Sequence, residues 1–171
     1  PTIVRAIEPE YVIQATGYSR PHTAHCGPDG IYVNALGSAD GNAPGGIFVL
    51  DPETFEIKGR WEKDRGPQQL AYDFWWHLGH DTMITSEWGT PNMVENGVNP
   101  ELLLAGKYGN ALHVWDLHSR RHLQKLELGF VDTQQTGQLM SRATEDLQSI
   151  RVFLGYGLVW VSQSAPTNQL A

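Results

Sequence analysis

Two pairs of histidines offer the clearest potential for chemistry in this sequence. His22 and His25 form one His-x-x-His pair, and His77 and His80 form another. Neutral imidazole is a good ligand for copper and other transition metals. Side chains at positions i and i+3 of a β-strand point to opposite faces, so one strand supplies one ligand unless a bulge intervenes. Histidines from different strands therefore have to converge to make a metal site. On spacing alone, hydrogen bonding between strands is the favoured role of both pairs.

A thiol and several carboxylates accompany these histidines. Cys26 could be a soft copper ligand or a redox thiol, but a lone cysteine on a strand is more often buried in the packing, and we expect that role. Glu87 could orient an imidazole ligand or cap the loop that begins at Gly89, and both readings stay open. Asp73 and Asp116 are expected to accept backbone hydrogen bonds in turns.

Other catalytic signatures are not found. No Gly-x-Gly-x-x-Gly stands at a strand–helix junction, and neither a phosphate-binding loop nor a Gly-x-Ser-x-Gly elbow is present. The glycine-rich stretch at residues 37–46 lies between two predicted strands. A hairpin loop is therefore a better interpretation of this stretch than a phosphate cradle.

Charge and composition limit the classes of partner. The chain has 171 residues, with 12 Lys and Arg against 19 Asp and Glu, and its net charge is −7. This balance argues against nucleic acid or an anionic membrane as the main partner. No apolar run approaches the roughly 20 residues of a membrane-spanning helix. The single cysteine precludes an intrachain disulfide. It favours a cytoplasmic protein and leaves a periplasmic one open.

A repeated pattern of short strands predicts the fold. Residues 46–51 form an apolar strand that ends in Asp51, and residues 55–61 alternate apolar and polar side chains after a turn at residues 51–54. Residues 112–116 and 121–128 repeat this layout. Two further strands are expected before each hairpin, at residues 22–26, 31–36, 71–77 and 82–87. We therefore predict an all-β chain with two four-stranded units, which are typical of β-propeller blades.

A long insertion interrupts the second unit, from Gly89 to Asn110. One short helix is expected within it. Asn99 is a good N-cap, Pro100 suits the first helical position, and Gly106 suits the end of the helix. Insertions of this length on a propeller usually cover one face or the central channel.

Five stretches of sequence resemble the selenium-binding protein family, whose members include methanethiol oxidases. They are residues 20–26, 45–56, 72–76, 83–92 and 108–116, and the resemblance is nearly continuous over residues 1–129. It implies that the chain is about two blades of a seven-bladed, WD40-like propeller. It further implies copper-dependent oxidation of methanethiol with O2 to formaldehyde, hydrogen sulfide and hydrogen peroxide. Some members of the family are described as binding selenium.

The resemblance also directs attention to particular residues. It makes His22 and His25 the candidate copper ligands. Glu87 and His80 are candidates for side chains behind the ligands, and a structural role is favoured for His80. The family's paired His-His motif, its His-Glu motif and the cysteine pair credited with selenium attachment are not found here. Residues 1–171 alone are therefore expected to be inactive.

The tail differs from the rest of the chain. Residues 130–171 are rich in Gln, Ser and Thr and lack the family's next blade, and a reading-frame change near Gly129 is one explanation. Two other functions stay open beside the oxidase. One is a non-enzymatic protein that binds selenium or a metal, and the other is a propeller scaffold that binds protein partners through the insertion at residues 89–110.

Overall fold

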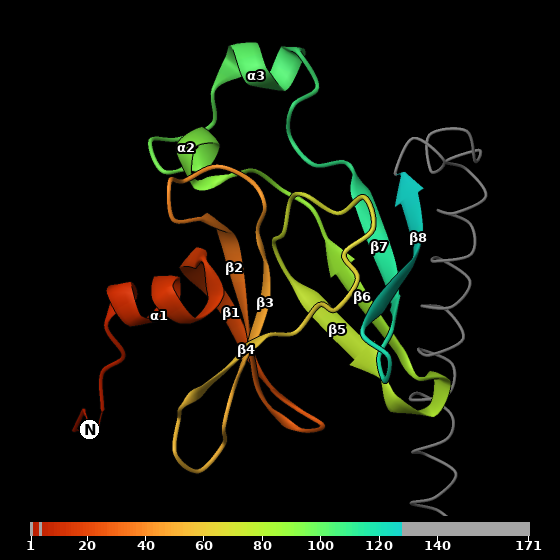
Figure 1. Cartoon of the computed structure of the whole chain (residues 1–171). Helices are drawn as coiled ribbons and strands as arrows, with labels where there is room; N and C mark the ends of the chain where they lie inside the picture. Colours follow the sequence, from red (N-terminus) through yellow and green to blue (C-terminus); the bar gives the residue numbers. More distant parts are fainter. Residues whose placement is uncertain (1, 4, 128–171) are drawn as a thin grey trace, which may run out of the picture. The chain divides into compact units, whose positions relative to one another are not determined.

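Two four-stranded antiparallel sheets form the framework of residues 2–3 and 5–127, the part of the chain that the computed structural model describes (Figure 1). The strands of each sheet follow one another in chain order. The first sheet consists of β1 (Tyr18–Gly27), β2 (Gly30–Ser38), β3 (Gly46–Leu50) and β4 (Ile57–Arg60). The second sheet consists of β5 (Phe74–His77), β6 (Thr82–Ser86), β7 (Ala111–Asp116) and β8 (Arg121–Glu127). The two predicted four-stranded units are thereby confirmed, and the predicted divergent tail at residues 130–171 lies outside the described residues.

Both faces of the first sheet are covered, which explains why β2 and β3 are almost continuously buried. One face packs in a cluster with α1 (Pro9–Thr16), formed by Val12, Tyr18, Val33, Ala35, Phe48 and Leu50. The other face packs against the second sheet, in a cluster formed by Tyr32, Ile47, Val49, Trp61, Phe74, Met83, Trp115 and Leu117. The apolar runs of these strands therefore reflect burial on two sides.

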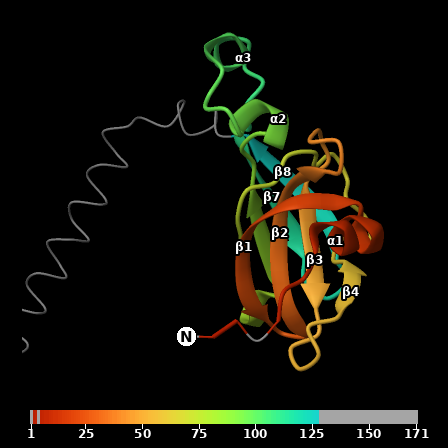
Figure 2. The same cartoon turned by 90° about the vertical axis from the view of Figure 1, so that its left-hand side faces the viewer.

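Helix α1 was not expected, because the segments of the chain were interpreted as strands. Its boundaries nevertheless follow from local signals. Pro9 stands at the first helical position, and Gly17 ends the helix in the left-handed conformation at φ 72°, donating its N–H to the Ile13 carbonyl. Val12 and Thr16 are buried, and the helix lies beside the first sheet (Figure 2). Its stability comes from this packing, since eight residues make a marginal helix alone.

The insertion contains two short helices, α2 (Pro91–Val94) and α3 (Pro100–Leu104). The prediction for α3 is confirmed, because the Asn99 side chain accepts the Glu101 N–H at 2.8 Å and the Leu102 N–H at 3.3 Å. Helix α2 was not predicted. Leu104, on α3, is 90% exposed. None of the helices in residues 2–3 and 5–127 is long and apolar enough to cross a membrane.

Candidate functional site

A bulge in β1 brings the two candidate ligands to the same neighbour. Pro21 pairs with Ala35 of β2 and Ala24 pairs with Val33, so β1 advances three residues where β2 advances two. The extra residue reverses the alternation of side chains along the strand. His22 and His25 therefore both contact the segment that leads into β5. The sequence had left open whether such a bulge exists.

His22 is held by the backbone of this segment. Its Nδ1 lies 3.1 Å from the Tyr72 carbonyl oxygen, and its ring lies 4.5 Å from the Tyr72 ring between centroids. A carbonyl oxygen can only accept, so Nδ1 carries the proton and Nε2 keeps its lone pair. Metal-binding histidines commonly show this arrangement, in which one ring nitrogen donates to a carbonyl and the other is left for the metal.

His25 offers a second imidazole nitrogen. Its Nε2 is buried without a hydrogen-bond partner, and the nearest acidic atom is Asp73 Oδ1 at 3.5 Å. The rings of Phe74 and Trp75 stand edge-on to the imidazole at 5.0 and 4.8 Å. Buried nitrogens without a partner are rare in folded proteins and call for an explanation, such as a missing ligand.

A hollow of about 420 Å³ lies beside His25, and it is bordered by Asp73, Trp75, Ile84 and Leu112 among others. Trp75 and Ile84 are 62% and 44% exposed, so this face of the second sheet offers apolar surface to a small molecule. The two candidate ligand atoms are of a type that copper prefers, because both are imidazole nitrogens. Within residues 2–3 and 5–127, however, no three His, Cys, Asp or Glu side chains converge as they would around a metal ion.

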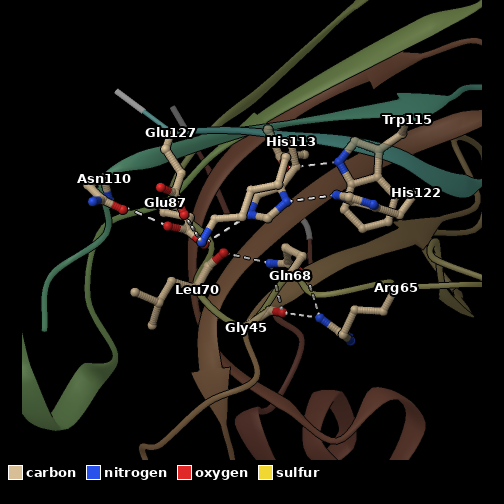
Figure 3. A network of polar contacts seen from close by, with 12 residues as sticks. Gly45, Arg65, Gln68, Leu70, Glu87, Asn110, His113, Trp115, His122 and Glu127 are labelled. Atoms are coloured by element: carbon tan, nitrogen blue, oxygen red, sulfur yellow. Dashed lines mark hydrogen bonds and ion pairs between the residues drawn. The ribbon is translucent and has the colours of Figure 1, made fainter. Parts of the chain in front are cut away.

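Glu87 contacts an imidazole, but not one of the candidate ligands (Figure 3). Its Oε1 lies 2.9 Å from Nε2 of His113, a fully buried residue of β7. The other nitrogen of His113, Nδ1, lies 2.9 Å from Nε2 of His122 on β8. Glu87 Oε2 also accepts the Asn110 N–H at 3.4 Å. The carboxylate thus orients a ring and also holds the end of the insertion.

The contacts of Glu87 and His122 set the protonation states of these two side chains. Burial acts to raise the pKa of Glu87, but the hydrogen bond with His113 and the charge of Lys125 outweigh it, and the pKa is lowered. The pKa of His122 is lowered by burial and by His113. Glu87 is therefore ionised at neutral pH and accepts from Nε2 of His113, and His122 is neutral.

The remaining predicted residues are placed as follows. His80 is exposed, and its ring lies 4.5 Å from that of His77, at the opposite end of β5 from Asp73. The expected burial of Cys26 is wrong, because β1 is the edge strand of its sheet and Cys26 is exposed on it. Asp116 accepts the Ser119 N–H at 2.6 Å, which confirms its predicted role in a turn.

Asp73 has a second contact that the sequence did not indicate. It accepts the N–H of Phe74 at 2.8 Å, as a turn residue does, but its other neighbour is His25. The His113–His122 pair was also missed. One signal was available: His113 and Trp115 are two positions apart on one strand, so both face the core, and a buried imidazole needs partners.

Comparison with known proteins gives a consistent result. The model of the 56 kDa selenium-binding protein family matches residues 1–162. The chain belongs to the selenium-binding protein family. It is 41% identical over 130 residues to a methanethiol oxidase of Danio rerio, and 40% identical over 129 residues to the one of Homo sapiens. It is 39% identical over 129 residues to selenium-binding protein 2 of Mus musculus.

A solved structure of the family shares the fold. The hypothetical selenium-binding protein from Sulfolobus tokodaii superposes with a TM-score of 0.70 and 50% sequence identity, over 73% of this chain and 27% of that one. The three curated relatives are matched over 75% of this chain but only 27–28% of their own length. The chain thus corresponds to little more than a quarter of a family member.

Proposed function

We propose that this chain is part of a copper-dependent methanethiol oxidase, in which its two sheets are consecutive blades of a β-propeller. The observation that carries the proposal is the placement of His22 and His25. One bulged strand directs both imidazoles to the same segment, where the Tyr72 carbonyl holds Nδ1 of His22, and Nε2 of His25 is buried without a hydrogen-bond partner. The relatives named methanethiol oxidase support the choice of reaction.

The proposed reaction converts methanethiol, oxygen and water to formaldehyde, hydrogen sulfide and hydrogen peroxide. Bound copper would supply a coordination position for the thiolate and one-electron chemistry with oxygen. The hollow beside His25 suits so small a substrate, because Ile84 and Leu112 can contact a methyl group. The Asp73 carboxylate, 3.5 Å from His25 Nε2, is placed to accept the proton that the thiol releases.

Copper titration of the complete 171-residue chain tests this assignment. The chain is expected to retain copper after gel filtration, and His22→Ala and His25→Ala are expected to lose it. His80→Ala is the matched control, since His80 is an exposed histidine on another element, and it should bind as the parent does. Equal copper retention by the parent and His25→Ala would refute the assigned ligand.

A second measurement separates an oxidase from a binding protein. The alternative is a non-enzymatic protein that binds selenium or a metal, and it is favoured by the likeness to selenium-binding protein 2. Methanethiol is added to the copper-loaded chain without oxygen, and the electron paramagnetic resonance of Cu(II) is followed. A His25-dependent loss of the signal that air restores supports the oxidase. A Cu(II) signal that methanethiol does not change supports the non-enzymatic alternative.

A third role as a protein-binding scaffold rests on one surface. Leu103 and Leu104 of α3 are 56% and 90% exposed at the insertion that the sequence marked as a docking surface. We propose the oxidase ahead of this role because the histidine arrangement needs a small-molecule explanation. A cytoplasmic location is proposed with it, since the lone Cys26 is exposed and free and an exposed thiol persists best in a reducing compartment.

A further inference from the structure

Oxidisable aromatic side chains form an unbroken row that begins at His25 and enters the core between the sheets. The His25 ring lies 4.8 Å from that of Trp75 and 6.1 Å from that of Trp76, and the two indoles stack 5.2 Å apart. Trp76 lies 5.8 Å from Tyr32. The row continues to Trp61 at 6.3 Å from Tyr32. Every step joins rings that are close enough for an electron to pass between them.

Tyr32 combines two features that suit it to the end of such a path. Its hydroxyl donates to Asp29 Oδ1 at 2.5 Å, so a proton acceptor is already in contact with the phenol. Tyrosine loses an electron readily only when its phenolic proton can leave at the same time. Trp61 differs, because its Nε1 is buried without a hydrogen bond to a carboxylate that could take its proton. One-electron oxidation of a ring in this row should therefore end as a radical on Tyr32.

Tyr32 also borders a second hollow, of about 410 Å³, whose lining includes Asp29, Lys63 and Arg120. Arg120 forms an ion pair with Asp29, while Lys63 is exposed on the segment between β4 and β5. A small reductant that enters this hollow would reach the phenol of Tyr32. The charged side chains of the lining balance, since Asp29 and Asp81 accompany Lys63 and Arg120, so a small neutral thiol suits this hollow.

We propose that Trp75, Trp76 and Tyr32 conduct oxidising equivalents away from the His22–His25 site to the hollow beside Asp29. This transfer would protect the site when its reaction with oxygen does not lead to product. This role rests on the function proposed above. A one-electron oxidant formed from oxygen or peroxide beside His25 takes an electron from the stacked indoles. Tyr32 returns the electron to the indoles as its proton passes to Asp29. A small thiol then reduces the tyrosyl radical by transferring a hydrogen atom to it, and Asp29 releases its proton to solvent. The thiol leaves as a thiyl radical, and two thiyl radicals combine to a disulfide.

The chain offers a way to test the path without copper. Cys26 is its only cysteine, is exposed and is adjacent to His25. A ruthenium polypyridyl complex attached to its thiol can be photo-oxidised by a flash in the presence of a quencher. Transient absorption then distinguishes tryptophan radicals from tyrosyl radicals. The outcome does not depend on metal binding by His22 and His25, so a failed copper titration and a failed path are separate results.

The labelled parent is expected to form a tyrosyl radical whose lifetime a small thiol shortens. Tyr32→Phe should abolish that signal and leave a longer-lived tryptophan radical. Trp76→Phe, which keeps an aromatic ring but resists oxidation, should also abolish it, and Trp76→Tyr should restore electron transfer. Trp88→Phe is the matched control, because Trp88 stands edge-on to Tyr72, which is outside this row, and it should change nothing. A tyrosyl signal that survives in Tyr32→Phe or Trp76→Phe overturns the proposal.

Discussion

His113 lies between Glu87 and His122, and the Nε2 of its fully buried ring lies 2.9 Å from Oε1 of Glu87. The Glu87 side chain is only 7% exposed, so the pair is almost completely removed from water. These contacts join the end of β6 to β7 and β8 (Figure 3). A buried carboxylate is sensitive to the loss of an imidazole that donates to it.

Replacing His113 with phenylalanine should therefore destabilise the fold strongly. The ring volume is kept, but a buried carboxylate loses its donor, which costs about 3 kcal/mol of unfolding free energy. Urea denaturation followed by tryptophan fluorescence measures the loss. The double variant Glu87→Leu with His113→Phe should recover much of it, because replacing both partners removes the unpaired charge. His118→Phe, at an exposed position, is the control, and an equal loss there would contradict the explanation.

His122 predicts how stability changes in mild acid. The pKa of His122 is lowered from its usual 6.5, so just below that pH the unfolded chain binds a proton that the folded chain does not. Stability then falls as the pH drops through 6.5 toward the folded pKa, since the unfolded state binds more protons. His122→Gln keeps a side chain that can form a hydrogen bond with His113 and has no proton to bind. Its loss of unfolding free energy over this interval should be smaller than that of the parent, and an equal loss would exclude His122 as the cause.

Most of the strand framework follows from local sequence, while the pairing of polar side chains does not. Alternation located the hairpin around Asp51, and the Asn99 cap located α3, because both signals reside in neighbouring residues. Asp51 indeed accepts the Thr54 N–H at 2.9 Å in that turn. The bulge in β1 depends on how β1 meets β2. Pro21 within the strand is compatible with an edge strand or a bulge, but it does not distinguish them.

The site shows the same division between local and long-range information. His22 and His25 could be chosen from the sequence, but their contacts with residues 72–75 join two sheets and depend on tertiary packing. The burial of Cys26 was predicted wrongly because residues 22–26 do not themselves show whether their strand lies at the edge of its sheet. Helix α1 was missed although Gly17 marked its end, since the strand pattern dominated the interpretation of its neighbours.

Glu62 predicts a pH effect of the opposite sign. Its carboxylate accepts the Ile47 N–H at 2.7 Å and the Tyr18 hydroxyl at 3.2 Å, but burial still raises its pKa above the usual 4.5. Above pH 4.5 the unfolded chain releases a proton that the folded chain retains, so stability falls as the pH rises through the folded pKa. Glu62→Gln has no proton to release, so its unfolding free energy should lose less over this interval. Thermal unfolding between pH 4.5 and 7 measures the difference, and parallel curves would contradict it.

Gly17 ends α1 in a conformation that other residues adopt with strain. At φ 72° a Cβ would lie 2.5 Å from Nη2 of Arg60. The Nε of the same guanidinium donates to the Thr16 carbonyl. Gly17→Ala should therefore lose about 1 kcal/mol or more from the left-handed backbone, and further stability from displacement of Arg60. Gly106→Ala is the matched control, since Gly106 follows α3 at a similar positive φ, of 62°, but has nothing within 4 Å of its added Cβ. If Gly17→Ala is at least as stable in urea as the control variant, the Arg60 contact does not secure the end of the helix. Helix α1 is then held by its buried face alone.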